Sequence, residues 1–397
     1  MSESELSEKR SDKRSIRVVV VGPSPRFLSG ISYYTLRLSN ALSLKMQVTS
    51  LLFRHMLPRR FFPGWRRVGD DLSTLKFADK VRVMEILDWY NPFSWVHGIR
   101  VIRDADVVIL EWWTSSVAHM YLALQILNYL DKPILVEFHE VVDPFEHSVG
   151  PIRVYSRVMG RLIRRLADRY AAHSEHDRRL IASQYRIPEE QIAVIPHGLY
   201  DHYPILDQEE EKRTFHAEGL FIFLFFGLIR PYKGVIHLIH AFEMLPITVR
   251  ERSLLIIVGE AWEDKISLEA ASASLMADRI RFMNRYVSDD EVPRYFSAGD
   301  CLILPYIRAS QSGVAHIGIS YGLPVIASEV GGIAESLSGY GGTVFVPPSD
   351  EQELSRAMEQ VFEAGPIRHP VPEHLRWESV AEQYGSVIAH MTSGRKI

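Results

Sequence analysis

Two cations in this sequence stand where a phosphate could be held. Arg230 and Lys233 lie in the loop LIRPYKG, directly after the apolar run FIFLFFG at 221–227. That run is typical of a buried parallel strand, and the residues after the loop are typical of a helix. Cations beyond a strand's C-terminal end, beside a helix N-terminus, concentrate positive charge where a diphosphate could bind. The alternative is a pair of ordinary surface cations in a loop.

The stretch 299–335 contains a second candidate anion site. An apolar run at 301–305 predicts a strand, a polar loop follows at 308–313, and a short helix is expected to end near Gly322. The open N–H groups at the start of that helix would face the C-terminal edge of a parallel sheet, where anions bind. An ordinary strand-to-helix loop is the alternative interpretation.

Gly30 and His139 follow two further predicted strands, at 16–22 and 133–138. Gly30 begins a helical segment, so it either lets a phosphate or sugar approach the backbone or simply makes a turn. The full G-x-G-x-x-G pattern is absent, which argues against nicotinamide chemistry. His139 lies just beyond its strand, where ligand contact is expected, although a lone histidine can equally be a packed residue.

A basic and aromatic patch occupies 54–67, with the sequence RHMLPRRFFPGWRR. Its five arginines include Arg59 and Arg60, its aromatic residues include Trp65, and it contains no acid. Such a patch could bind a phosphorylated acceptor or rest on an anionic membrane surface. Alternatively, it is a loop whose aromatic side chains pack inward.

The predicted helix at 151–172 is basic and amphipathic. Its arginines are Arg153, Arg157, Arg161 and Arg165, and its adjacent apolar residues are Val154, Val158, Leu162 and Leu166. Spacing by four residues places each set along one face. The helix could lie on a membrane, or it could pack its apolar stripe on the core and leave the arginines in solvent.

Composition bounds the class of protein. The chain has 397 residues, 47% apolar and 24% charged, with a net charge of −4, so general attraction to nucleic acid is not expected. A single cysteine, Cys301, excludes an intrachain disulfide and fits a reducing compartment. No run reaches the roughly 18 apolar residues that a membrane helix needs. We expect a cytoplasmic protein, with peripheral contact to the inner face of the membrane through the arginine-rich segments.

Strands and helices alternate along the whole chain, which predicts an α/β protein with two doubly wound, Rossmann-like parallel-sheet domains. After a polar tail at 1–15, the first domain is expected at 16–204. The acidic stretch DQEEEKR then marks the start of a second domain at 205–371. The last helical segment, 372–397, is expected to return to the first domain.

The chain resembles the family 4 glycosyltransferases of the GT-B fold over nearly its full length. The segments that carry the resemblance are FLSGISYYTLRLSNAL, the strand ending EFHE, HSEHDRRLIASQYRIPEEQIAVIPHG, FFGLIRPYKGVIHLIHAF and LPYIRASQSGVAHIGISYGLPVIASEVGGIAE. The resemblance implies a UDP- or GDP-linked sugar donor held mainly by the C-terminal domain, across a cleft from a glycan, lipid-linked or small-molecule acceptor. It also implies retaining transfer with neither a metal nor another cofactor.

The resemblance assigns roles to individual residues. His139 matches the active-site histidine near the transferred sugar, Lys233 matches the lysine that holds the diphosphate, and Gly30 matches the glycine near the donor phosphates. The family's arginine falls on Leu228, and Arg230 is expected to replace it. The remaining donor-side positions are Ser312, Gly313 and Val314 facing phosphate and sugar, and Tyr286 and Val287 lining the base pocket. Glu335, after the Gly-Gly turn, is either a donor-side residue or only structural.

The sequence departs from the family at the Glu-x7-Glu motif. Its two acids fall near Ser310, at the donor sugar, and near Gly318, at the ribose. One interpretation is an active branch that uses a QSG loop instead. Another is a GT-B protein that has lost catalysis and serves as a nucleotide-binding or partner-binding scaffold. A third is an epimerase or phosphorylase on the same scaffold.

Overall fold

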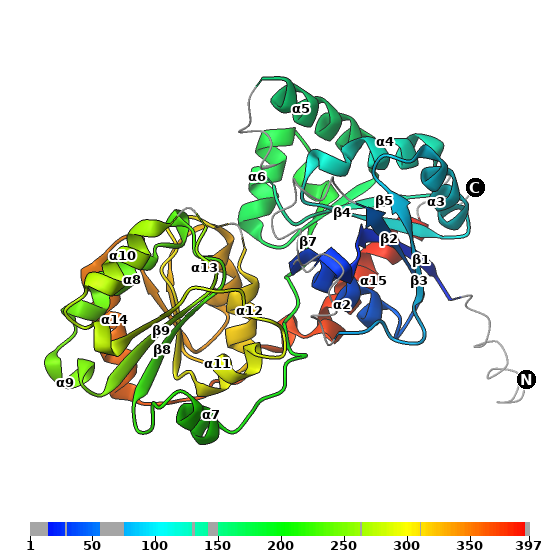
Figure 1. Ribbon diagram of the computed structural model, residues 1–397. Coiled ribbons are helices and arrows are strands. Elements are labelled where there is room, and N and C mark those ends of the chain that lie inside the picture. The colour runs from blue at the N-terminus through cyan, green and yellow to red at the C-terminus, as the bar shows by residue number, and fades with distance from the viewer. Residues whose placement is uncertain are drawn as a thin grey trace, which may run out of the picture.

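The computed structural model describes residues 15–27, 30–55, 75–128, 132–141, 150–262, 264–309 and 311–393. It contains two parallel sheets, one in each of two lobes (Figure 1). No helix among these residues is long and apolar enough to cross a membrane.

The N-terminal sheet has the strand order β3-β2-β1-β4-β5-β6-β7, and every pairing in it is parallel. The strands are β1 (Arg17–Pro23), β2 (Gln47–His55), β3 (Arg82–Asp88), β4 (Val107–Trp112), β5 (Ile134–Phe138), β6 (Arg169–Ala172) and β7 (Ile192–Val194). The helices are α2 (Gly30–Leu42), α3 (Pro92–Arg103), α4 (Ala118–Leu127), α5 (Gly150–Arg165) and α6 (Glu175–Tyr185). The direction of winding reverses between β1 and β4.

The C-terminal sheet has the order β10-β9-β8-β11-β12-β13, again entirely parallel. The strands are β8 (Phe221–Phe226), β9 (Ser253–Val258), β10 (Ile280–Met283), β11 (Cys301–Leu304), β12 (Val325–Ser328) and β13 (Thr343–Val346). The helices are α7 (Gln208–Thr214), α8 (Val235–Met244), α9 (Ile247–Arg250), α10 (Lys265–Ala273), α11 (Val292–Ala298), α12 (Gly313–Ser320), α13 (Gly331–Ser338) and α14 (Glu351–Ala364). Here the winding reverses between β8 and β11.

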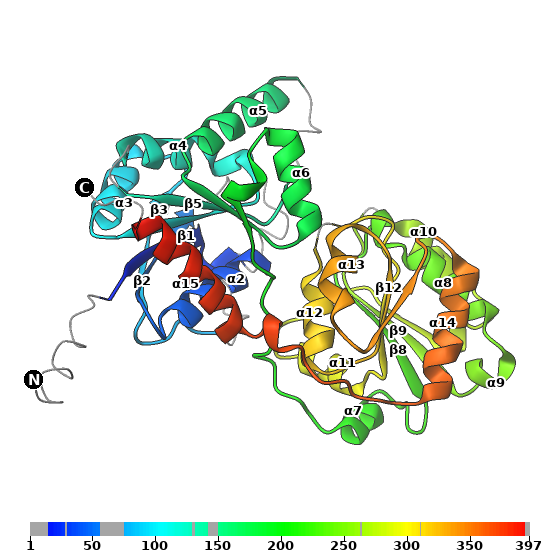
Figure 2. The same ribbon diagram turned by 180° about the vertical axis from the view of Figure 1, so that it is seen from behind.

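The last helix, α15 (Trp377–Ser393), returns to the N-terminal lobe and packs on α2 (Figure 2). The indole N–H of Trp377 donates to the carbonyl of Leu199 at 2.7 Å, which fixes the start of the helix beside the segment that links the lobes. Tyr384, fully buried, lies 3.1 Å from the hydroxyl of Tyr34 on α2. The C-terminal segment therefore completes the core of the first domain.

Helices α6 and α13 bring the two lobes together. The carboxylate of Glu335 on α13 accepts hydrogen bonds from the backbone N–H groups of Glu175 and His176, at the start of α6. Beside it, the amide of Gln311 donates to Asp177 at 3.3 Å. A negative side chain is favoured at a helix N-terminus, so these contacts stabilise the approach of the domains.

The apolar stripe predicted along 151–172 does not pack on the core, so the inward-packing alternative is wrong. Val154, Val158 and Leu162 are 62%, 47% and 36% exposed. The buried face of α5 is instead the one that carries Ser156 and Ile163. Its arginines and its apolar stripe therefore both face solvent.

Candidate active site

The candidate donor site lies at the winding reversal between β8 and β11. In open α/β sheets, ligands bind at the carboxyl edge at this point. The loop after β8 contacts the loop after β11, because the N–H of Ile307 donates to the carbonyl of Tyr232 at 2.8 Å. Gly234 closes the first loop with φ +67°, and a Cβ there would lie 2.0 Å from the carbonyl oxygen of Pro305. Only glycine fits, which explains the glycine in RPYKG.

Arg230 and Lys233 are brought together on this edge as predicted from their spacing. The Arg230 guanidinium lies 5.0 Å from the ring centre of Trp262, and the Lys233 ammonium lies 3.8 Å from that of Tyr306. Across the described parts of the chain, neither cation forms an ion pair. Aromatic faces hold them in place without neutralising them. Both charges thus remain available to an anion.

The start of α12 faces the same loop. Ser312 caps the helix by accepting from the N–H of Ala315 at 3.3 Å, and Gly313 is the first helical residue. Val314 packs toward the loop after β8, within 3.3 Å of where a Cβ on Gly227 would lie. The N–H groups of the first turn are therefore directed to the edge that carries Arg230 and Lys233.

Tyr200, in the segment linking the lobes, lies close to both Gly30 and Gly313. That a phosphate or sugar approaches these two glycines stays a prediction. A Cβ on Gly30 would lie 3.3 Å from the Tyr200 hydroxyl, and one on Gly313 would lie 3.1 Å from it. The hydroxyl donates to the carbonyl of Gly30 at 3.3 Å. Both glycines therefore lie against one buried phenol that spans the two domains.

Of the other predicted donor-side positions, Tyr286 and Val287 lie on the described carboxyl edge and Ser310 does not belong to the described residues. Tyr286 and Val287 follow β10 on the carboxyl edge, beside an Arg285–Glu291 ion pair at 2.5 Å that lowers the pKa of Glu291 to about 2.

Gly318, where the family's ribose-binding acid falls, lies on the buried side of α12, because an added Cβ there would lie 2.5 Å from the side chain of Leu302 on β11. That a ribose-binding acid is missing from this chain stays a prediction. The expectation that Glu335 faces the donor is corrected. Both of its oxygens bind α6, so it bridges the domains rather than facing a donor.

His139 lies at the end of β5, where its N–H extends the sheet by bonding to Trp112 at 2.9 Å. Its ring contacts Tyr34 edge-on at 4.6 Å and faces His173 at 5.0 Å between ring centres. Burial, with the nearby His173 and His197, holds the pKa of His139 well below its usual range. His139 is therefore a neutral imidazole at physiological pH, and among the described residues its buried Nε2 has no hydrogen-bond partner.

Two fully buried glutamates lie behind this histidine. Glu111 on β4 accepts from Thr35 on α2 at 2.5 Å, and Glu137 on β5 accepts from the hydroxyl of Tyr384. Burial raises the pKa of Glu137 to about 7. Burial and the nearby Glu137 raise the pKa of Glu111 well above its usual range. Like charges in a dry site disfavour double ionisation, so the pair holds at least one proton near neutral pH.

Within the described residues, one group of side chains comes close enough to share a metal ion, namely Glu137, His139 and His173, whose ligand atoms lie within 4.8 Å of one another. Part of this group is already hydrogen-bonded within the protein. His173 Nε2 and His139 Nδ1 bond to each other at 3.3 Å, and Glu137 accepts from Tyr384. That no metal is required stays a prediction.

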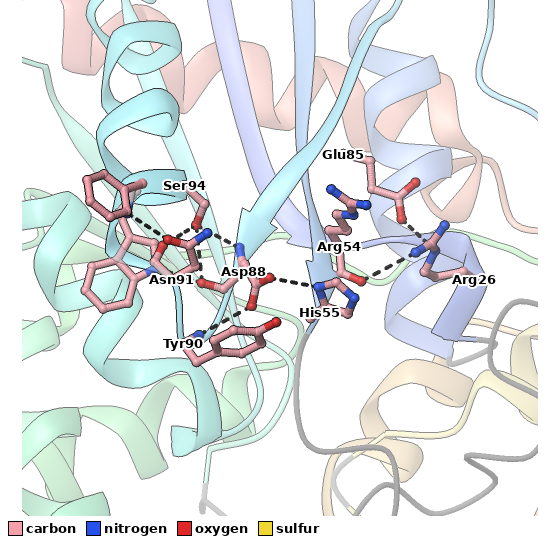
Figure 3. Close-up of polar contacts among 10 residues, drawn as sticks. Arg26, Arg54, His55, Glu85, Asp88, Tyr90, Asn91 and Ser94 are labelled. Carbon is pink, nitrogen blue, oxygen red and sulfur yellow. Dashed lines mark hydrogen bonds and ion pairs between the residues drawn. The ribbon is translucent and has the colours of Figure 1, made fainter.

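At the carboxyl edge of the N-terminal sheet, polar side chains pair near the ends of β2 and β3 (Figure 3). Arg26 pairs with Glu85 at 2.7 Å, and His55 pairs with Asp88 at 2.8 Å. Next to them Tyr90 and Phe93 are 60% and 81% exposed. The predicted acceptor or membrane residues Arg59, Arg60 and Trp65 lie in 56–74, outside the described residues, whereas Arg157 and Arg161 lie on the exposed side of α5.

Sequence reasoning missed the buried ring cluster around His139. A signal was present, because three neighbouring strands are each followed by a histidine: His139 after β5, His173 directly after β6 and His197 shortly after β7. Parallel strands bring such positions to one edge. The ring centre of His197 lies 5.0 Å from that of His316 on α12. The row of neighbouring rings therefore extends from the N-terminal domain into the C-terminal domain.

Comparisons with known proteins define the class. Residues 28–201 match the model of Glycosyltransferase Family 4, and residues 207–376 match that of Glycosyl transferases group 1. Together the two matches span both lobes. The chain therefore belongs to the family 4 glycosyltransferases, which confirms the resemblance inferred from its motifs.

Particular relatives are distant and match in part. The D-rhamnosyltransferase WbpZ of Pseudomonas aeruginosa is 28% identical over 66% of this chain and 65% of its own length. The lipopolysaccharide 1,2-N-acetylglucosaminetransferase of Salmonella typhimurium is 24% identical over 50% of this chain and 56% of its own length. The chain thus matches less than two thirds of the length of each.

Solved structures confirm the GT-B fold. HepE of Anabaena in complex with UDP superposes with a TM-score of 0.64 at 16% identity, covering 96% of this chain and 98% of that one. Sucrose-phosphate synthase of Thermosynechococcus elongatus gives a TM-score of 0.66 at 16% identity, covering 96% and 100%.

Proposed function

We propose that this protein is a retaining glycosyltransferase that moves a sugar from a nucleoside diphosphate sugar to a glycan or lipid-linked acceptor. The observation that carries the proposal is the pair of unneutralised cations, Arg230 and Lys233, beside the first turn of α12 at the β8–β11 reversal. Positive charge and open N–H groups on one edge suit a diphosphate. The relative from Salmonella typhimurium, named as a lipopolysaccharide 1,2-N-acetylglucosaminetransferase, supports the acceptor class.

The proposed mechanism is electrostatic. Breaking the anomeric C–O bond leaves negative charge on the diphosphate and develops positive charge on the sugar. Arg230, Lys233 and the N–H groups around Gly313 stabilise the leaving charge. The acceptor hydroxyl bonds to the anomeric carbon on the same face and gives its proton to the leaving phosphate oxygen, which retains the configuration. No metal is invoked in this scheme.

The acceptor is proposed to lie along the N-terminal lobe. The exposed rings of Tyr90 and Phe93 offer apolar faces for a sugar, beside the His55–Asp88 pair. On the same lobe, α5 presents arginines together with an exposed apolar stripe. That combination suits the surface of an anionic membrane, where a lipid-linked acceptor would be held.

A Lys233→Ala variant tests the transferase proposal. Loss of one contact to the leaving group costs about 3 kcal/mol in the barrier, roughly a hundredfold in rate. The readout is transfer of labelled sugar from a panel of nucleoside diphosphate sugars to lipid-linked and free glycans. Lys265→Ala, at the start of α10, is the matched control. A rate unchanged by Lys233→Ala would refute the assignment.

A scaffold without catalysis is the second candidate, and the absence of the family's acid pair favours it. Retention of partner binding by Lys233→Ala, with no transfer by the wild type to any acceptor, would support it. Sugar release without an acceptor would instead support an epimerase or phosphorylase.

A further inference from the structure

His173 forms one continuous hydrogen-bonded chain with His139. Its Nδ1 lies 3.1 Å from the backbone carbonyl oxygen of Ile195, and its Nε2 lies 3.3 Å from Nδ1 of His139. The His173 side chain is only 1% exposed. Three groups on three segments, after β5, after β6 and after β7, are therefore fixed relative to one another.

The direction of each hydrogen bond follows from the first acceptor. A carbonyl oxygen can only accept, so Nδ1 of His173 carries a proton. Burial lowers the pKa of His173 to about 3, so the ring is neutral and its Nε2 carries a lone pair. Nδ1 of His139 must then donate. Because His139 is also neutral, its own Nε2 carries a lone pair, and that is the atom without a partner.

The groups around His173 are consistent with this assignment. Glu137 from β5 lies 3.6 Å from Nε2, too far for a hydrogen bond to compete with His139. Tyr34 from α2 faces the ring edge-on at 5.3 Å, and His197 from the linking segment lies at 5.4 Å. Within the described residues, no other polar atom contacts Nε2 of His173.

We infer that His173 is a positioning residue, which with the Ile195 carbonyl holds His139 in the tautomer whose Nε2 is a hydrogen-bond acceptor. The group that His139 receives is then a donor, and the class of group is a hydroxyl of the sugar or of the acceptor, not a phosphate or carboxylate oxygen. This inference rests on the proposed function for the identity of the ligand, but the tautomer itself does not.

Substitutions at position 173 can separate positioning from packing. In His173→Gln, the amide can place an oxygen near the site of Nε2 and so keep an acceptor for His139. In His173→Asn, the shorter amide can still donate to Ile195 but does not reach His139. The matched control is His197→Asn, since His197 is a partly buried neighbouring ring that donates to Gly198 at 2.7 Å and not to His139.

The spectroscopic readout is ¹⁵N NMR of the full-length protein labelled at histidine, with His139 assigned by substitution. We expect the wild type, His173→Gln and His197→Asn to carry the His139 proton on Nδ1. In His173→Asn we expect that proton to move to Nε2. UDP and GDP binding by calorimetry reports separately on folding and on the donor site.

The kinetic readout is the kcat for sugar transfer. We expect His173→Asn to lower kcat about tenfold or more at nearly unchanged donor KM, and His173→Gln to restore most of it. Wild-type His139 protonated on Nε2, a cationic His173, or stoichiometric metal lost from His173→Asn would each overturn the inference. Equal kcat in His173→Asn and wild type would overturn it too. If no nucleotide binds and no sugar is transferred, the proposed function fails while the NMR result still decides the tautomer.

Discussion

Glu137 makes the stability of this protein depend on pH in a direction opposite to that of most carboxylates. The substitution that reveals it is Glu137→Gln, which removes the charge but leaves an amide oxygen to accept from Tyr384. Burial raises the pKa of Glu137 to about 7, against an ordinary value of 4.5. Between these values the folded protein keeps a proton that the unfolded chain has lost.

The sign follows from this difference in bound protons. When the folded state binds more protons than the unfolded state, the free energy of unfolding falls as pH rises. The contribution of Glu137 is therefore complete below about pH 4.5, declines up to about pH 7 and is flat beyond. The difference between the two pKa values corresponds to about 3 kcal/mol.

Urea unfolding, followed by tryptophan fluorescence, measures the effect at pH 5 and pH 8.5. We expect Glu137→Gln to unfold with a free energy close to that of wild type at pH 5 and about 3 kcal/mol higher, relative to wild type, at pH 8.5. Buried neutral histidines such as His173 lower the free energy of unfolding toward low pH in both proteins. Their contribution therefore cancels in the difference between Glu137→Gln and wild type. Glu363→Gln, at an exposed position, is the control.

A parallel pH dependence in Glu137→Gln and wild type would refute this reasoning, because it would mean that Glu137 is ionised in the folded protein at pH 5. A variant that is less stable than wild type at both pH values by the same amount would do so as well. It would indicate that the carboxylate contributes only through its hydrogen bonds.

Three further predictions concern the cleft and the surface. Gly313→Ala places a methyl 3.1 Å from the Tyr200 hydroxyl, so we expect it to raise the KM for the donor about tenfold. Adding Tyr200→Ala should relieve part of this increase. An unchanged KM in Gly313→Ala would contradict the prediction. Glu335→Gln removes the charge from the bonds to α6, and a loss of about 1 kcal/mol should raise the population of separated lobes about fivefold, seen as a larger radius of gyration by small-angle scattering. Val158→Glu on α5 should abolish co-sedimentation with vesicles of anionic lipid at low salt; wild-type protein that stays in the supernatant would sink the membrane proposal.

The fold and the donor edge were accessible from sequence because they depend on local patterns. Buried parallel strands appear as short β-branched runs, and the loop after each run lies on the same edge of the sheet. Spacing alone therefore placed Arg230 and Lys233 at the carboxyl edge, beyond the strand that precedes them. The same reasoning located His139 at a carboxyl edge.

The exposure of α5, the role of Glu335 and the contacts of Tyr200 and His173 depend on which surfaces meet in three dimensions. The apolar stripe of α5 has the spacing of a core-facing helix, yet its neighbours leave it exposed, and periodicity does not say which face is covered. Glu335 looked like a donor residue because of the turn before it, but its partners come from a helix more than 150 residues away. Tyr200 and His173 act through contacts between segments distant in sequence, for which a single sequence carries only indirect signals.

The proposed function requires that the edge carrying Arg230 and Lys233 holds a nucleoside diphosphate sugar. The most direct test is calorimetric titration of the purified wild type and of Lys233→Ala with UDP, GDP, ADP and their common sugar conjugates. We expect selective binding of one nucleotide by the wild type and at least tenfold weaker binding by Lys233→Ala. A folded wild-type protein that binds none of them, or a Lys233→Ala variant that binds as tightly, would contradict it.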